Sequence, residues 1–395
     1  MEQSPSNTNT TWHQNAKFGI IIHWGVYSVP GYDSPAHAKR RNIMNGSEWY
    51  LKRLTSTFRV GPSERLTKEY HTTNYPNCSY QDLAGRFTAT NWNPNEWAAL
   101  IARSGARYAI ITAKHHDGFC LWKTDTNHDW NSADVGPKRD IVSEFRSAIM
   151  RLDSTKLHQG IVRFGLYYSW HEWNRNTGVD VCGKEYVSNI VTRQIQELAK
   201  YKPNIVFFDG DWLRMCKHWH AKQAMELLSS AVPDIAINDR LGKKESYLSV
   251  SRNDNSPLCT YRTFADRTTP TSPPINTHTK QPWHWERVDT IGLSWGRNRQ
   301  QTDKDYKSVE ELVTLLIDVV CKGGCLLLNL GPNSDGTLDI IEVERLEGFG
   351  KWLEKNGEAI YDTVPGTEPL TTNKNGKIFR FVRKNVPGGW EYVCI

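Results

Sequence analysis

The chain has 395 residues, 38% of them hydrophobic and 23% charged, which is typical of a globular rather than a disordered protein. Its net charge of +6 comes from 49 basic and 43 acidic residues scattered along the chain. No basic stripe indicates a nucleic-acid partner, and no apolar run is long enough to span a membrane. Because the polar first residues lack the apolar centre of a secretory signal, we expect a cytoplasmic protein, unless a leader has been removed.

Tryptophan is unusually frequent, with 16 copies. An indole ring can stack on the apolar face of a sugar and still donate one hydrogen bond. Most of these side chains are expected to fill a large core. Composition alone therefore makes carbohydrate binding a hypothesis and no more.

Short apolar runs alternate with longer amphipathic segments. The apolar runs predict strands at 18–25, 107–115, 162–169, 204–210, 234–239, 289–296 and 325–331. The amphipathic segments predict helices at 93–105, 187–201, 221–231 and 308–324. The apolar runs do not alternate with polar residues, as expected for parallel strands buried on both faces. The pattern therefore predicts an α/β fold, a (β/α)8-like barrel of the TIM type.

Two segments depart from this pattern. Residues 243–282 are rich in Ser, Thr, Pro, Asn and Arg, and a loop of that length inside a compact domain is usually functional. Residues 364–395 read as a few short strands. We therefore expect a catalytic barrel over 1–363 and a short C-terminal β segment over 364–395 that leans on it.

Polar residues follow five of the predicted strands. They are His23 and Trp24; His115, His116 and Asp117; Tyr167 and Tyr168 with His171 and Glu172; Asp209; and Asn238, Asp239 and Arg240. Each has a structural explanation by itself, such as an Asx turn at an Asp-Gly pair. In a barrel, however, the C-terminal strand ends meet at one rim, where active sites lie. We expect these side chains to converge there.

A metal centre is one interpretation of this rim, since His23, His115, His116 and Asp209 are zinc-ligand types. Adjacent histidines on an extended chain point to opposite faces, however, and the cysteines do not show the paired spacing of a zinc site. We expect no metal and no cofactor. A neutral ligand with many hydroxyl groups suits the side chains better.

Long motifs link the chain to a known family. They are KFGIIIHWGVYSVP, GSEWY, YAIITAKHHDGFCLW, FGLYYSWHEW, PNIVFFDGDW, IAINDRLG, WERVDTIGLSWGRN and GGCLLLNLGPNSDG. In this order, from about Lys17 to Thr363, the sequence resembles the α-L-fucosidases of glycoside hydrolase family 29. The resemblance implies a retaining exo-glycosidase that removes terminal α-L-fucose from oligosaccharides or glycoconjugates. It also implies that the C-terminal segment is the remnant of a β-sandwich that relatives often carry.

The resemblance assigns the catalytic carboxylates. Asp209 of the FFDGDW segment would be the nucleophile, with Asp211 as its nearest rival. Retaining chemistry needs a second carboxyl group roughly 5–5.5 Å away. Asp266 in TYRTFADR is the preferred acid/base, Glu286 in WHWER is the alternative, and Glu245 stands behind both.

The same comparison implies the sugar contacts. They are His23, Glu48, Trp49, His115, His116, Tyr167 and Arg240. Trp295, with Ile21, would line a slot for the C5 methyl group of fucose, and such an apolar wall disfavours a hydroxylated sugar. Lys114 and Asp117 are expected to brace the turn that carries the two histidines.

Three other functions stay open at this point. One is a fucose-binding protein with impaired catalysis. Another is a retaining glycosidase for a related sugar, such as a galactoside. The third is a metallohydrolase.

Overall fold

A computed structural model describes most of the chain: residues 11–34, 46–57, 60–152, 160–173, 183–212, 218–242, 259–272, 274–275, 280–366, 371–372, 378–387 and 389–394. Eight parallel strands form its main sheet, and they are β1 Phe18–Ile22, β2 Tyr108–Lys114, β3 Arg163–Ser169, β4 Ile205–Asp209, β5 Ala236–Ile237, β6 Arg262–Thr263, β7 Trp285–Thr290 and β8 Gly324–Leu330. Their order is β5-β4-β3-β2-β1-β8-β7-β6, so β1 lies between β2 and β8. This order is that of a TIM-like barrel and confirms the predicted fold class.

The sheet comes round on itself between the two shortest strands, β5 and β6. The Thr260 N–H donates to the Ile237 carbonyl at 2.8 Å, and the Asp239 carboxylate accepts from the Thr263 N–H at 2.9 Å. These contacts replace a regular strand ladder there. As a result, the segments that follow β5 and β6 meet at the same rim.

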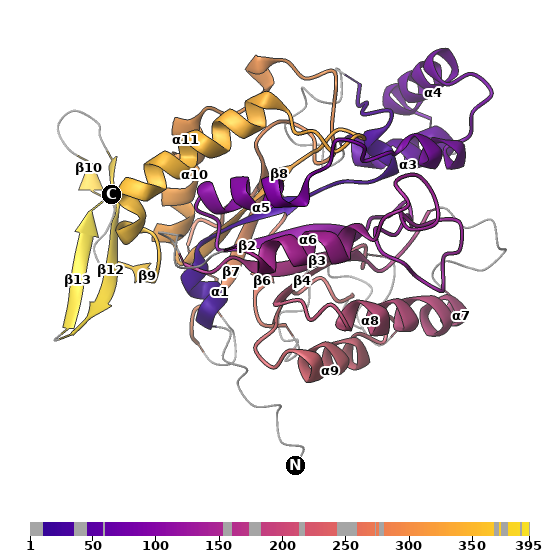
Figure 1. Cartoon of the computed structure of the whole chain (residues 1–395). Helices are drawn as coiled ribbons and strands as arrows, with labels where there is room; N and C mark the ends of the chain where they lie inside the picture. Colours follow the sequence, from indigo (N-terminus) through magenta and orange to yellow (C-terminus); the bar gives the residue numbers. More distant parts are fainter. Residues whose placement is uncertain are drawn as a thin grey trace.

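Helices cover the outside of the sheet (Figure 1). The α-helices are α1 Thr11–Ala16, α3 Tyr50–Thr55, α4 Pro62–Asn74, α5 Pro94–Arg103, α6 Ile141–Met150, α7 Lys184–Tyr186, α8 Thr192–Ala199, α9 Ala221–Ala231, α10 Val309–Cys321 and α11 Ile340–Asn356. Shorter turns are η1 Val26–Ser28, η2 Ser47–Trp49, η3 Gln81–Arg86, η5 Val187–Val191, η6 Asp303–Asp305 and η7 Gly357–Ala359. Among the described helices, none has the length and apolarity needed to cross a bilayer.

Both faces of the strands are buried, as the continuous apolar runs predict. Inside the barrel, Ile21, Ile110 and Leu327 pack with other inward-facing side chains. On the outer face, alternate residues such as Ile111 and Leu328 join the core beneath the helices. A single strand therefore supplies two cores, and its sequence shows no polar alternation.

The helix starts carry their own signals. Ser308 and Glu311 cap α10 reciprocally, each side chain accepting from the other residue's N–H at 3.1 and 2.8 Å. At α5, the Asn93 side chain accepts from the N–H of Asn95 at 3.1 Å, and Pro94 occupies the first helical position. These caps fix where each crossover turns back toward the sheet.

The structure corrects the prediction for β7. The apolar run 289–296 was expected to be the strand, but β7 spans Trp285–Thr290. Its charged residues have partners inside the fold, since Glu286 Oε2 lies 3.0 Å from His13 Nε2 and Arg287 pairs with Asp289. The sequence pattern alone cannot show such partners, so the charged segment does not read as a buried strand.

The long segment 243–282 contains β6, which the sequence analysis did not predict; its first part, 243–258, lies outside the described residues. The predicted C-terminal strands are confirmed. β9 Thr363–Pro365, β12 Phe381–Val386 and β13 Gly389–Cys394 form one antiparallel sheet, and β10 Thr371–Thr372 pairs with β11 Ile378–Phe379. Arg380 donates to Asp318 of α10 at 2.6 Å, so this segment leans on the helix layer. Its separation from the barrel at residue 363 stays a prediction.

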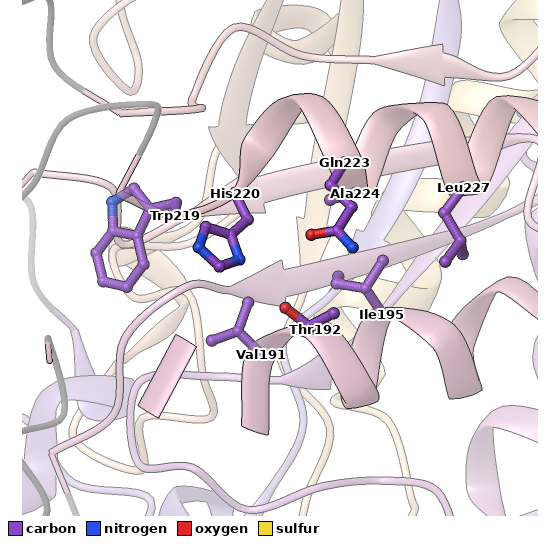
Figure 2. A pocket seen from close by; sticks show the side chains of 8 residues that line it. All are labelled: Val191, Thr192, Ile195, Trp219, His220, Gln223, Ala224 and Leu227. Atoms are coloured by element: carbon purple, nitrogen blue, oxygen red, sulfur yellow. The ribbon is translucent and has the colours of Figure 1, made fainter. Parts of the chain in front are cut away.

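A small hollow lies in the outer helix layer, between the η5–α8 segment and α9. Figure 2 shows the side chains that line it, among them Ile195, Trp219 and Gln223. Its volume of about 10 Å³ gives room for roughly one water molecule. It is too small for a substrate and contains none of the predicted site residues.

Lys114 ends β2 and is fully buried against the layer of α7 and α8. Its ammonium group is 2.9 Å from Glu172 Oε1 and 2.9 Å from Gln194 Oε1. The hydroxyls of Tyr168 and Tyr186 complete the cage at 3.1 and 3.2 Å. Lys114 therefore braces the strand end that carries the two histidines, as the sequence analysis expects.

Replacing this buried cation should be costly. Lys114→Met leaves the Glu172 carboxylate buried without its partner, so the free energy of unfolding should fall by about 3–5 kcal/mol in denaturant titration. Lys123→Met is the matched control, because its ion pair with Asp134 is exposed and should contribute less than about 1 kcal/mol. Equal losses in the two variants would contradict the bracing role.

Candidate active site

Asp209 ends β4 at the rim of the barrel and is 8% exposed. Its Oδ1 accepts from Arg240 Nη1 at 2.9 Å, and its Oδ2 accepts from the Tyr167 hydroxyl at 2.8 Å. Burial alone would raise the pKa of Asp209, but the Arg240 charge, these two hydrogen bonds and the Gly210 N–H outweigh it. The pKa is held below its usual range, so the carboxylate is ionised.

Arg240 joins the two predicted catalytic aspartates. Its Nη1 binds Asp209, its Nη2 binds Asp266, and its Nε donates to Thr263 Oγ1 at 3.2 Å. Thr263 in turn donates to Asp239 at 2.8 Å, which fixes the hydroxyl as an acceptor for Arg240. The guanidinium is thus oriented by β6 and carries one carboxylate on each arm.

His23 is held in one tautomer by a neighbouring amide. Asn329 Nδ2 donates to the Trp295 carbonyl at 2.6 Å, so its Oδ1 faces His23 Nδ1 at 2.5 Å and accepts from it. Burial lowers the pKa of His23, although Glu48, Asn329, Asp209 and Asp266 oppose this shift. A neutral His23 with a protonated Nδ1 presents Nε2 as an acceptor for a ligand hydroxyl.

His116 is fixed in the same way. Ser169 donates to the His171 carbonyl at 2.7 Å, so its oxygen accepts from His116 Nδ1 at 2.6 Å. The bare Nε2 then lies 3.7 Å from Asp209 Oδ2. Burial lowers the pKa of His116 well below its ordinary value, and nearby His171, His23, Arg240 and Lys114 lower it further. A ligand hydroxyl can donate to this nitrogen beside Asp209 Oδ2.

His115 completes the group of imidazoles. Its ring centroid is 4.2 Å from that of His116 and 5.6 Å from that of His23. Burial and the neighbouring imidazoles also lower its pKa, and its buried Nδ1 has no hydrogen-bond partner among the described residues. The three histidines are therefore neutral hydrogen-bonding groups rather than cations.

Three tryptophans stand beside these imidazoles. Trp49 stacks on Trp212, with centroids 5.9 Å apart, and packs against Trp173 at 4.7 Å. His116 and His171 contact both Trp173 and Trp212. The half-buried indoles offer the stacking surfaces that a sugar ring needs.

Glu48 and Trp295 come from opposite parts of the chain and meet near His23. Glu48 accepts from the N–H groups of Gly46 and Gly296 at 2.7 and 3.1 Å, which ties η2 to the loop after β7. Trp295 lies 5.4 Å from His23 between ring centroids and is 5% exposed. Ile21 is 0% exposed and lies deeper in the barrel, so only Trp295 is placed to meet a ligand.

The alternative acid/base, Glu286, is the second residue of β7. Its carboxyl group accepts from the Tyr108 hydroxyl at 2.5 Å and lies 3.0 Å from His13. Glu286 also pairs in register with Thr263 of β6, which contacts Arg240, and the Arg240 charge acts on the Glu286 carboxyl group. Its assignment as the alternative acid/base stays a prediction.

The other rivals are also placed. Asp211 accepts from the Gly242 N–H at 3.0 Å and anchors the loop that follows β5. Glu245 lies outside the described residues. A metal at the rim is disfavoured, because Arg240 and Tyr167 each already donate to one oxygen of Asp209.

Several residues of the site were not predicted. Ser169, Thr263 and Asn329 orient His116, Arg240 and His23, but small polar residues in buried strands carry no distinctive sequence signal. Trp173 and Trp212 could have been found, since each follows a strand that ends in a predicted catalytic or binding residue.

Comparisons with known proteins cover almost the whole chain. The sequence model of the family described as Alpha-L-fucosidase matches residues 1–358. An alpha-L-fucosidase of Dictyostelium discoideum is 33% identical over 391 residues, covering 94% of this chain and 77% of that protein. The plasma alpha-L-fucosidase of Homo sapiens is 35% identical over 365 residues, covering 89% of this chain and 69% of that protein.

Solved structures give the same result. The alpha-fucosidase of Thermotoga maritima superposes with a TM-score of 0.75 at 36% identity, covering 94% of this chain and 80% of that one. Its complex with fucose superposes with a TM-score of 0.75 at 35% identity over the same shares of the two chains.

Proposed function

The chain belongs to the alpha-L-fucosidase family, and we propose that it hydrolyses terminal α-L-fucose by double displacement, with Asp209 as the nucleophile. The observation that carries this assignment is the ionised carboxylate at the end of β4, held by Arg240 and Tyr167 and flanked by neutral imidazoles. Such a carboxylate can attack an anomeric carbon and form a fucosyl-enzyme.

We propose Asp266 as the acid/base. It follows β6, its side chain is 20% exposed, and it shares Arg240 with Asp209, so both carboxyl groups lie on one guanidinium. As a general acid, Asp266 would deliver a proton to the leaving oxygen, so its contact with Arg240 would have to open first. We infer that the arriving sugar draws the Arg240 arm to its own hydroxyls and frees Asp266.

The remaining rim residues suit a neutral sugar. His23, His115 and His116 offer fixed donors and acceptors without charge, and Trp49 and Trp295 offer apolar faces. These contacts support fucose over a galactoside if Trp295 meets the C5 methyl, because an added hydroxyl would have no partner there. The cytoplasmic location and the lack of a nucleic-acid or membrane partner stay predictions.

The nucleophile assignment predicts the effect of one substitution. Asp209→Gly should lower kcat on an aryl α-L-fucoside by at least about a thousandfold, because no carboxylate remains to form the fucosyl-enzyme. Azide should restore turnover with inversion of configuration. Asp211→Asn is the matched control, because Asp211 lies two residues further along the chain, and this variant should keep most of its activity. If Asp211→Asn loses far more activity than Asp209→Gly, Asp211 is the nucleophile.

The hydrogen bond from Tyr167 predicts a change in the pH profile. In Tyr167→Phe the Asp209 carboxylate loses one donor, so its pKa should rise and the acidic limb of kcat/KM should move up by about one pH unit. Activity would then disappear at a higher pH as the solution is acidified. Tyr108→Phe, which removes a hydroxyl at the other end of the barrel, should leave that limb in place.

The acid/base assignment predicts a dependence on the leaving group. Asp266→Asn should slow hydrolysis of fucosides with poor leaving groups by about 100-fold or more, and activated aryl fucosides much less. Azide should accelerate release of fucose from this variant, because a small anion needs no general base. Glu286→Gln should show neither behaviour. An unchanged leaving-group dependence in Asp266→Asn would exclude Asp266.

A further inference from the structure

The opposite end of the barrel holds a cluster of metal-ligand side chains that the proposed reaction does not use. His13 comes from α1, His284 immediately precedes β7, and Cys325 is the second residue of β8. One donor atom from each lies within 4.8 Å of the others. In Figure 1, α1 lies beside the starts of the strands, whereas α3 and the rim lie at the other end.

The cluster is buried and tightly spaced. His13 and Cys325 are 0% exposed, and His284 is half-buried. His13 Nδ1 is 2.8 Å from His284 Nε2, and the Cys325 thiol lies 3.2 Å from the His13 carbonyl. Two imidazoles and a thiol therefore converge at a place that water hardly reaches.

Glu286 orients the central imidazole. His13 Nε2 lies 3.0 Å from Glu286 Oε2, so the other ring nitrogen, Nδ1, faces the cluster. A carboxylate that accepts the second N–H of a histidine is the usual outer partner of a metal-bound imidazole.

We propose that His13, His284 and Cys325 bind a zinc ion that fastens α1 to β7 and β8 at the closed end of the barrel. Two nitrogens and one thiolate form a ligand set typical of zinc. Binding forms a Zn–S bond and releases the thiol proton to solvent. The proton between the two imidazoles moves to His284 Nδ1, which has no partner among the described residues, so both facing nitrogens become ligands.

Metal analysis of the full-length protein tests this site. After growth with zinc and gel filtration, the wild type should contain about one zinc ion per chain. Replacing zinc by Co²⁺ should give intense tetrahedral ligand-field bands and a near-ultraviolet sulfur-to-cobalt charge-transfer band. If the chain contains no bound zinc and its Co²⁺ spectrum lacks the sulfur band, the three side chains form only a hydrogen-bonded cluster and the proposal is overturned.

Substitutions locate the metal. Cys325→Ser should abolish the sulfur-to-cobalt band, and His284→Ala should lower zinc affinity at least about tenfold. Cys78→Ser is the matched control, since Cys78 is half-buried and lies outside the cluster. If Cys325→Ser fails to fold, the zinc affinity of His284→Ala still tests the proposal, because His284 is only half-buried and its replacement disturbs the core less. Unchanged zinc content and spectrum in both cluster variants would contradict the assignment.

Discussion

The contact between the Arg240 guanidinium and two aspartates is the interaction on which the site depends. Arg240 is 3% exposed, and a cation so deeply buried is tolerated only when carboxylates and hydrogen-bond acceptors surround it. Asp209, Asp266 and Thr263 supply these groups. Arg240 follows β5, Asp209 ends β4, Thr263 ends β6 and Asp266 follows β6, so the same contacts span the short strands and keep the Asp209 carboxylate ionised. The contacts of Arg240 that help to close the barrel are therefore the same contacts that keep Asp209 ionised.

The neutrality of the three imidazoles follows from this arrangement. Burial lowers the pKa of all three, and the Arg240 guanidinium and the Lys114 ammonium lower that of His116 further. Ser169 and Asn329 then determine which ring nitrogen of His116 and His23 carries the proton. The rim offers directed hydrogen bonds in a setting of few charges, which matches the hydroxyl groups of a neutral sugar.

Much of this arrangement could be predicted from sequence, for definite reasons. Strands such as β2 are apolar throughout because both faces are buried, and their polar C-terminal residues can be read directly from the sequence. The sequence did not predict the bounds of β7, because the partners that make its charged residues tolerable in the core are remote in the chain. His13 is 273 residues from Glu286, and Tyr108 is 178 residues from it. A similar separation along the chain hid the cluster of His13, His284 and Cys325.

The central claim is that Asp209 attacks the anomeric carbon of fucose. Incubation with a 2-deoxy-2-fluoro-α-L-fucosyl donor that has a good leaving group slows both steps of the reaction and favours accumulation of the covalent intermediate. Peptide mass spectrometry should then find one fluorofucosyl group, attached to Asp209 in the segment PNIVFFDGDW. A label on another carboxylate, or rapid turnover with inverted configuration and no label, would contradict the account.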